Sequence, residues 1–357
     1  MKVLSVLGAR PQFIKAAPVT RALQEAGVTE YLLHTGQHYD YGLSQIFFDE
    51  LGIPEPDANL GVGSGTHGVQ TGEMMMGIEK VLRVENPDWV LVYGDTNSTL
   101  AGALTAAKLH FPVAHVEAGL RSFNRQMPEE HNRVLTDHCS TLLFAPTRNA
   151  ADNLGREGIS QGVHQVGDTM YDAVLRFLEV ARQRSTILAD LGLEPQGYYV
   201  ATVHRPGNTD SPQNLRDILA ALLELEGPVV FPVHPRTRRK LGELEDEPPL
   251  AGADSPLRLV EPVGYLDMLI LQAHARAVLT DSGGMQKEAY FLDVPCVTLR
   301  EETEWVETVQ AGRNRLAGAD KEAILEAVAG FAAQSSTPAR VFGDGNAAEK
   351  VAALLQA

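Results

Sequence analysis

Three carboxylates stand where chemistry is expected in an open α/β sheet. Asp95 follows the apolar run 89–93, and Glu117 follows the run 113–116. Glu129 stands in the first turn of an expected helix, where the helix dipole favours an acid in any case. Open α/β sheets carry their chemistry at the carboxyl ends of the strands. Carboxylates that share a cleft can split their pKa values, one protonated and one ionised, so this set predicts acid/base chemistry.

A glycine pair marks a second kind of site in the other half of the chain. The apolar run 276–280 is followed by Ser282, Gly283 and Gly284, and a helical stretch that contains Glu288 comes next. Glycines let the backbone approach a ligand closely, and the free N–H groups at a helix N-terminus attract an anion. We therefore expect a phosphate here. A glycine-softened turn without a ligand is the alternative for this segment taken alone.

Cationic side chains stand at two further strand ends. Arg10 follows the first apolar run, and Lys15 lies in the first turns of the next helix, close enough to share one anion with it. His204 and Arg205 follow the run 198–203 in the second half. Surface solvation accounts for any one of these cations alone. Their shared position at strand ends favours a phosphate ester as the ligand.

The sequence favours neither a metal nor a cofactor. The eleven histidines are scattered, with no His-Glu-x-x-His motif and no His/Cys cluster at ligand spacing. A Gly-x-Gly-x-x-Gly pattern occurs at 63–68. The residues before it, 57–61, indicate a polar loop instead of the strand that a dinucleotide fingerprint requires.

Composition sets the class of protein and its partners. A length of 357 residues, 44% of them hydrophobic, favours two domains. The net charge of −16 disfavours nucleic acid and anionic membrane as partners. Cys139 and Cys296 lie far apart inside apolar segments, as expected of reduced thiols. No apolar run reaches the roughly 18 residues that span a bilayer, so we expect a cytoplasmic protein.

Alternating elements must position these side chains. Apolar runs of strand length alternate with helical periodicity, which predicts parallel sheets and doubly wound α/β domains. The stretch 67–84 is an expected helix whose three consecutive methionines face the core, and 169–190 is expected as one long helix. The expected strands are 2–7, 30–34, 89–93, 113–116, 141–145, 163–166, 198–203, 228–233, 257–260, 276–280 and 295–299.

Together the motifs resemble those of the non-hydrolysing UDP-N-acetylglucosamine 2-epimerases, in order, from residue 3 to about 350. The resemblance implies a glycosyltransferase-B-like architecture of two Rossmann-like domains facing a cleft, no cofactor, and a homodimer. It divides the chain into an N-terminal domain, 1–168, and a UDP-binding domain, 169–343, with a helix at about 344–357 packing back onto the first. The motifs are Gly8-Ala9-Arg10-Pro11 with Lys15, Gly94-Asp95-Thr96, 115–121, 128–133, His204-Arg205, 280–284 with Glu288, and 342–345.

The resemblance also implies a reaction and its residues. The hydrogen at C2 of the sugar has no adjacent carbonyl, so loss of UDP from C1 must make it removable, leaving a glycal to which UDP adds back. By similarity the acid/base set is Asp95, Glu117 and Glu129. The residues implied to bind the UDP-sugar are Arg10, Lys15, Arg121, His204, Arg205, Ser282, Gly283, Gly284 and Glu288.

Four positions depart from the pattern of well-known bacterial members. Trp305 stands in place of Arg, Val263 in place of Gln, Gly207 in place of Glu, and Tyr41 in place of a Met in the motif tied to activation by substrate. The Tyr41 and Trp305 forms resemble an archaeal-like branch and relatives acting on UDP-2,3-diacetamido glucuronic acid. We favour UDP-N-acetylglucosamine, because a glucuronate asks for more positive charge. The diacetamido glucuronate, a glycosyltransferase and a silent sugar-nucleotide sensor are the alternatives.

Overall fold

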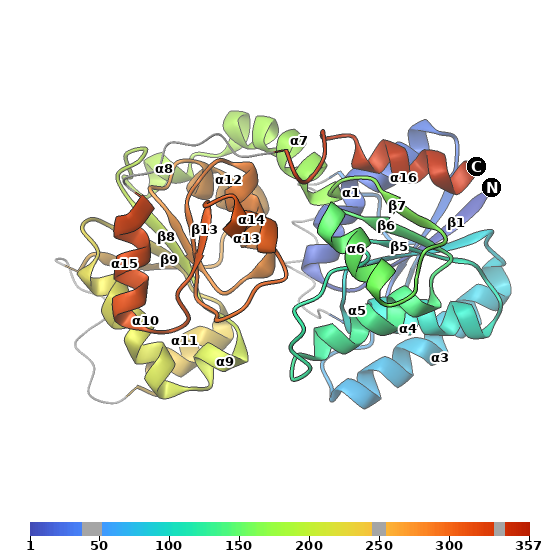
Figure 1. The fold of residues 1–357 in the computed structure, drawn as a ribbon, viewed down its shortest axis with the longest axis horizontal. Helices are drawn as coiled ribbons and strands as arrows, with labels where there is room; N and C mark the ends of the chain where they lie inside the picture. The colour runs from blue at the N-terminus through green and yellow to red at the C-terminus, as the bar shows by residue number, and fades with distance from the viewer. Residues whose placement is uncertain (38–51, 245–254, 332–339) are drawn as a thin grey trace. The chain divides into compact units, whose positions relative to one another are not determined.

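Two doubly wound units make up the protein. The computed structural model describes residues 1–37, 52–244, 255–331 and 340–357. It divides into one compact unit made of Met1–Leu175 with Arg340–Ala357 and another made of Arg176–Ala339. Each unit holds a parallel sheet with helices packed against it (Figure 1). The expected fold class, two Rossmann-like α/β domains, is confirmed.

The chain passes from the first unit to the second inside a helix. The sequence places the boundary before residue 169, whereas the first unit continues to Leu175, within α7 (Thr169–Arg184). No glycine or proline interrupts 169–184, so no turn signal in the sequence marks the crossing. The chain returns to the first unit at Arg340.

The sheet of the first unit reverses its order at its centre. Among the described residues it has seven parallel strands in the order β3-β2-β1-β4-β5-β6-β7, so the switch point lies between β1 and β4. Ligands of open α/β sheets bind outside the carboxyl ends of the strands at such a point. The strands are β1 (Lys2–Leu7), β2 (Thr29–His34), β3 (Ala58–Asn59), β4 (Trp89–Tyr93), β5 (Val113–Val116), β6 (Leu142–Ala145) and β7 (Val163–Gln165).

Helices of the first unit begin with the residue types that favour helix starts. Pro11 and Pro128 stand in first turns, where a missing N–H costs nothing, and Thr96 accepts a hydrogen bond from the Thr99 N–H to cap α4. The last helix lies beside the first one (Figure 1), as the contacts between α1 and α16 also show. The helices are α1 (Arg10–Glu25), α3 (His67–Glu85), α4 (Asn97–Lys108), α5 (Pro128–Cys139), α6 (Arg148–Arg156) and α16 (Ala347–Gln356).

The second unit repeats the design with another sheet. Within the described ranges its six parallel strands follow the order β10-β9-β8-β11-β12-β13, with the switch point between β8 and β11. The strands are β8 (Tyr199–Thr202), β9 (Val229–Pro232), β10 (Leu257–Val260), β11 (Val278–Thr280), β12 (Cys296–Thr298) and β13 (Asn314–Leu316). The helices are α8 (Ile187–Asp190), α9 (Pro206–Thr209), α10 (Pro212–Glu224), α11 (Pro235–Gly242), α12 (Tyr265–Ala273), α13 (Gly283–Phe291), α14 (Val306–Gln310) and α15 (Lys321–Phe331).

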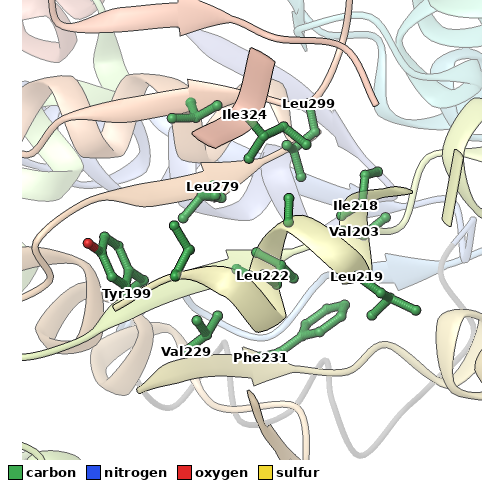
Figure 2. Packing of buried hydrophobic residues seen from close by; sticks show 14 of the residues in the cluster. Tyr199, Val203, Ile218, Leu219, Leu222, Val229, Phe231, Leu279, Leu299 and Ile324 are labelled. Carbon is green, nitrogen blue, oxygen red and sulfur yellow. The ribbon is translucent and has the colours of Figure 1, made fainter. Parts of the chain in front are cut away.

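A large cluster of buried apolar residues packs against one face of this second sheet. Figure 2 shows Ile218 and Leu222 of α10 among residues of the strands, including Phe231 and Leu279, with Ile324 of α15 nearby. These side chains are fully buried, and burying one such side chain is worth about 1.5–3 kcal/mol. The cluster therefore fixes the sheet from which the polar turns of this unit project. Among the helices in the described ranges, none has the length and apolar composition that crossing a bilayer requires.

Every expected strand matches an observed one, while four finer expectations are corrected. The strands β3 and β13 were not expected, because they are short and lie at sheet edges. Part of the loop expected at 57–61 is β3. The helix expected at 169–190 ends at Arg184, because the polar pair Ser185 and Thr186 interrupts it before α8. Met74 is in the core, but Met76 is 61% exposed, since consecutive helical residues point to different sides.

Candidate active site

A buried glutamine joins the first two strand ends of the first unit. Gln12 Oε1 accepts the N–H groups of Gly8 (2.8 Å) and Ala9 (3.0 Å) in the turn after β1. Its Nε2 donates to Tyr93 O (2.9 Å) at the end of β4. The turn that leads to Arg10 is thus fixed to the strand that leads to Asp95. Arg10 is the first residue of α1, and its side chain lies outside the described part of the structure.

Lys15 and Glu117 form a buried ion pair at this edge of the sheet. The Lys15 ammonium contacts the Glu117 carboxylate, and their side chains are 11% and 5% exposed. Both atoms lie against Gly94, because a Cβ built there would be 3.2 Å from Glu117 Oε2 and 3.2 Å from Lys15 Nζ. Glu117 itself has φ +72°, a left-handed conformation that is costly for a residue with a side chain. The structure therefore brings together two residues that the sequence assigned to the site.

Asp95 is paired with a cation from α5. Its carboxylate contacts the Arg133 guanidinium, and the Asn132 side-chain amide donates to Asp95 O (3.0 Å). The Arg133 side chain is 2% exposed, whereas that of Asp95 is 30% exposed. Asp95 thus keeps an accessible carboxylate beside a permanent charge. Arg133 had no role in the sequence interpretation, although it stands in one of the motifs.

The two neighbouring glutamates of α5, Glu129 and Glu130, have different roles. Glu130 is buried and accepts hydrogen bonds from the Ser122 N–H (2.9 Å), the Ser122 hydroxyl (2.8 Å), the Phe123 N–H (2.9 Å) and Arg133 (2.9 Å). These bonds fix the loop before α5. Glu129 is half-buried in the first turn of the helix. Glu129 therefore stays the candidate for chemistry, while Glu130 has a structural role.

Arg121 does not join the other predicted ligands. Its Nη1 donates to Asp137 Oδ2 (2.7 Å), and its Nε and Nη2 donate to the Glu157 carboxylate (2.7 and 2.6 Å). Burial lowers the pKa of Arg121, but these two carboxylates raise it overall, and the residue is 3% exposed. The Arg121 guanidinium is buried and bonds to Asp137 of α5 and to Glu157 at the end of α6, so it holds these two helices in position. We therefore do not retain Arg121 as a substrate ligand.

In the second unit one buried aspartate holds the turn that carries His204 and Arg205. The Asp281 carboxylate accepts the N–H groups of His204 (3.1 Å) and Arg205 (2.9 Å) and the Asn208 amide (3.0 Å). His204 Nδ1 lies 3.1 Å from Asp281 Oδ1, while the His204 side chain stays 41% exposed. Burial raises the pKa of Asp281, but the His204 side chain and these donors outweigh it, so the pKa lies below its ordinary value. Sequence reasoning gave Asp281 no role.

The glycine pair opens α13 as expected. Ser282 is the N-cap residue, and its N–H donates to Thr280 Oγ1 (3.0 Å). A Cβ on Gly283 would lie 2.5 Å from Glu304 Oε1 and 3.4 Å from Trp305 Nε1, so a side chain at this position would displace the Glu304 carboxylate. The first N–H groups of an α-helix have no partner within the helix, so this end of α13 favours an anion. Further along the same helix, the buried Glu288 accepts a hydrogen bond from Gln272 Nε2 (2.7 Å).

The unusual tryptophan covers a buried cation. Lys287 Nζ lies 4.0 Å from the centre of the Trp305 ring, and Lys287 is fully buried. An aromatic face stabilises such a cation electrostatically. Trp305 therefore partners the buried cation of Lys287. Gly207 is exposed in α9, and Tyr41 lies outside the described residues.

Both units share the design of proteins that bind nucleotides. Each has a parallel sheet with polar turns at its switch point, and the second opens a helix with two glycines. In the part of the chain that the structure describes, no three His, Cys, Asp or Glu residues are grouped to hold a metal ion. The model of the family UDP-N-acetylglucosamine 2-epimerase matches residues 21–356. The chain belongs to this family.

Relatives cover the whole chain. A UDP-N-acetylglucosamine 2-epimerase homolog of Methanococcus maripaludis is 53% identical over 100% of this chain and 99% of its own length. The UDP-2,3-diacetamido-2,3-dideoxy-D-glucuronate 2-epimerase of Pseudomonas aeruginosa is 48% identical over 99% of each chain. The crystal structure of Methanocaldococcus jannaschii UDP-GlcNAc 2-epimerase in complex with UDP-GlcNAc and UDP has a TM-score of 0.93 at 45% identity, covering 100% of this chain and 99% of that one. The family expected from the motifs is confirmed.

Proposed function

We propose that this protein interconverts UDP-N-acetylglucosamine and UDP-N-acetylmannosamine by inverting C2 of the sugar. The observation that supports this most is the pairing of two carboxylates with two cations at the switch point of the first sheet, Glu117 with Lys15 and Asp95 with Arg133. The Methanocaldococcus relative, matched over the whole chain, binds UDP-GlcNAc in its crystal structure. Carboxylates at this edge supply the bases and acids that inversion at carbon needs.

The chemistry proceeds by loss and return of UDP. A carboxylate takes the C2 proton while the C1–O bond breaks, and the electron pair of that bond leaves with UDP. The product is a glycal with a double bond between C1 and C2. A phosphate oxygen of UDP then bonds to C1 while a protonated carboxyl group delivers a proton to the opposite face of C2. We assign these proton transfers to Glu117, Asp95 and Glu129.

The diphosphate is the group that must carry negative charge away from C1. We assign its stabilisation to Arg10 and Lys15 of α1 and to the helix N-terminus at Ser282, Gly283 and Gly284. Fixed donors aimed at developing charge lower the barrier without reorganisation during the reaction. His204 and Arg205, on the turn that Asp281 holds, complete the nucleotide contacts, and Glu288 offers a buried carboxylate to hydroxyl groups of the nucleotide.

Proton NMR in D₂O separates the reaction classes. With UDP-N-acetylglucosamine alone, an epimerase produces both C2 epimers and places deuterium at C2 of each. A glycosyltransferase would release UDP only when an acceptor is added, and a sugar-nucleotide sensor would leave the spectrum unchanged. Either of these last two results contradicts the proposal.

The glucuronate relative supplies the second candidate substrate. The Pseudomonas enzyme named for UDP-2,3-diacetamido-2,3-dideoxy-D-glucuronate is 48% identical to this chain. We favour the unmodified sugar, because binding the carboxylate of a glucuronate would call for an additional cation. The departure at Trp305 removes a cation from the expected pattern instead of adding one. Measured kcat/KM values for the two substrates decide between them. A preference for the glucuronate of more than about a hundredfold, about 2.7 kcal/mol in transition-state binding, would overturn the choice of sugar and leave the reaction unchanged.

Assembly and compartment belong to the proposal as well. We expect a homodimer on the resemblance alone, and a cytoplasmic enzyme because nucleotide sugars are made and used there. The net charge of −16 disfavours nucleic acid as a partner. Sedimentation equilibrium measures the assembly directly, and a monomer at micromolar concentration would remove the dimer from the proposal.

A further inference from the structure

A buried histidine links the two turns that carry Asp95 and Glu117. His115 lies on β5 and is fully buried. Its Nε2 is 2.7 Å from Gly94 O, the carbonyl directly before Asp95. Its Nδ1 is 2.8 Å from Asp137 Oδ1 on α5. The ring therefore spans from the end of β4 to a helix that packs over β5.

The partners of the ring fix its protons. A carbonyl oxygen only accepts, so Nε2 must donate to Gly94 O. Asp137 Oδ2 accepts from the Gly119 N–H (3.1 Å) and from Arg121 Nη1 (2.7 Å), as an ionised carboxylate does. Asp137 Oδ1 is then an acceptor too, and Nδ1 donates to it. Both ring nitrogens therefore face an acceptor, and each is placed to donate a hydrogen bond.

The hydrogen bonds of His115 and Asp137 restrain backbone segments that adopt left-handed conformations. Gly94 has φ +64°, Glu117 has φ +72° and Gly119 has φ +82°. A left-handed residue with a side chain persists only where its surroundings hold it, at a cost of about 1–3 kcal/mol. His115 holds the Gly94 carbonyl, and Asp137 holds the N–H of Gly119 just after Glu117. Each contact restrains one of the turns on which a proposed acid/base residue stands.

We propose that His115 is a positioning residue for the epimerisation, setting the position of the Asp95 carboxylate relative to the Glu117 carboxylate through Gly94 and Asp137. The inference rests on the proposed function of those two acids. His115 is fully buried, so it acts through the backbone and not on the sugar. Arg121 belongs to the same network, because its Nη1 donates to Asp137 Oδ2 (2.7 Å).

Two amide substitutions separate the two contacts of the ring. In His115→Gln the amide nitrogen can take the place of Nε2 and donate to Gly94 O. In His115→Asn it can take the place of Nδ1 and donate to Asp137, which leaves the Gly94 carbonyl without its donor. We expect His115→Asn to lower kcat about 100-fold, as misplacing a reacting group by about 1 Å does. His115→Gln should stay within about tenfold of wild type, and UDP affinity should stay within about threefold in both variants.

The kinetic pattern tells positioning from general damage. Equal losses of kcat in the two folded variants, or a wild-type kcat in His115→Asn, would contradict the proposal. Thermal unfolding and circular dichroism report whether each variant folds. Wild-type activity under the same conditions is the control for the proposed function. If the wild type does not epimerise, that function fails, whereas an active wild type with the wrong variant pattern refutes the role of His115 alone.

One measurement needs no variant. Nitrogen-15 NMR of wild-type protein labelled at histidine should show a proton on both ring nitrogens of His115 at neutral pH, because each nitrogen faces an acceptor. The facing charged groups are Asp137 and, behind it, Arg121. A His115 ring with one unprotonated nitrogen would refute the network even if neither amide variant folds.

Discussion

At the scale of single residues, the protein pairs two of its three proposed acid/base carboxylates with a cation. Lys15 contacts Glu117 and Arg133 contacts Asp95, so both carboxylates are held in place by ion pairs. A neighbouring cation fixes the position of a carboxylate and favours its ionised form, which is the form that can accept a proton. The cations add attraction for the departing diphosphate.

Neutral amides in place of these acids should separate chemistry from binding. Glu117→Gln and Asp95→Asn keep the shape of the side chains but remove the proton acceptors. We expect each to lower kcat by at least about a thousandfold and to leave UDP affinity within a few fold, because acid/base groups typically contribute about 10²–10⁴-fold. Calorimetric titration with UDP and a coupled assay measure the two quantities. Loss of UDP binding by folded Glu117→Gln would show that the role assignment is wrong.

The adjacent glutamates of α5 form a natural matched pair. Glu130 accepts four hydrogen bonds while buried, and a glutamine there would turn an amide donor toward other donors. We expect Glu130→Gln to lower the free energy of unfolding by about 3 kcal/mol, mostly through unpaired buried groups. Glu129→Gln should cost less stability than Glu130→Gln and lower kcat instead. Urea unfolding of both variants tests this, and equal stabilities would contradict it.

Asp281 and His204 should act as a unit in nucleotide binding. Asp281 holds the turn and the ring of His204, so removing its charge should weaken UDP binding about as much as removing the ring. We expect Asp281→Asn and His204→Ala each to weaken UDP binding about tenfold, and the double variant to be little weaker than either alone. Additive losses of binding energy in this double-mutant cycle would show that the two residues act independently.

At the scale of elements, the strands were predictable from the sequence and the network around them was not. Every strand that an apolar run in the sequence predicted is present in the structure. Buried parallel strands consist of continuous runs of apolar residues, many of them β-branched, and such runs are easy to find. The missed strands β3 and β13 are two and three residues long and contain polar residues such as Asn59 and Arg315. Asp281 and His204 lie 77 positions apart in the chain. No local sequence pattern predicts a contact between residues so far apart in the chain.

The docking of α16 has its own dependence on pH. Asp172 of α7 accepts the Ala348 N–H at the start of α16 (2.7 Å). Burial raises the pKa of Asp172 from 3.8 to about 6, against the lowering effect of the Ala348 and Ala347 N–H groups, and the nearby Asp168 and Asp344 raise it further. Because the folded pKa lies above the unfolded one, this group's contribution to stability is present below pH 3.8 and is lost as the pH rises through about 6.

Asparagine at this position removes the titration and keeps an acceptor. From about pH 5 to about pH 7.5, the wild type should lose about 1 kcal/mol of unfolding free energy relative to Asp172→Asn. Denaturant unfolding of both proteins at the two pH values measures the difference. In Asp344→Asn the same loss should begin at lower pH, because the charge of Asp344 raises the pKa of Asp172. A difference between Asp172→Asn and wild type that does not change with pH would contradict the assignment.

At the scale of the whole molecule, the two units repeat one design with different chemistry. The first sheet carries acids and their cations at its switch point, and the second carries a helix N-terminus and a histidine turn at its own. The net charge of −16 makes such local gathering of positive groups necessary for a diphosphate ligand. The family and the fold were predictable because the motifs lie in order along the whole chain. The structural role of Arg121 was not, because it depends on Asp137 and Glu157 around it.

The central claim is that UDP leaves C1 and returns during inversion at C2. Positional isotope exchange tests it most directly. UDP-N-acetylglucosamine labelled with oxygen-18 at the oxygen between C1 and the β-phosphorus is incubated with the enzyme, and phosphorus NMR follows the label. The account predicts that the label spreads to the non-bridging oxygens of the β-phosphate as the C2 epimers form. Epimers that form while the label stays in the bridge would contradict it, because C1–O cleavage would then play no part.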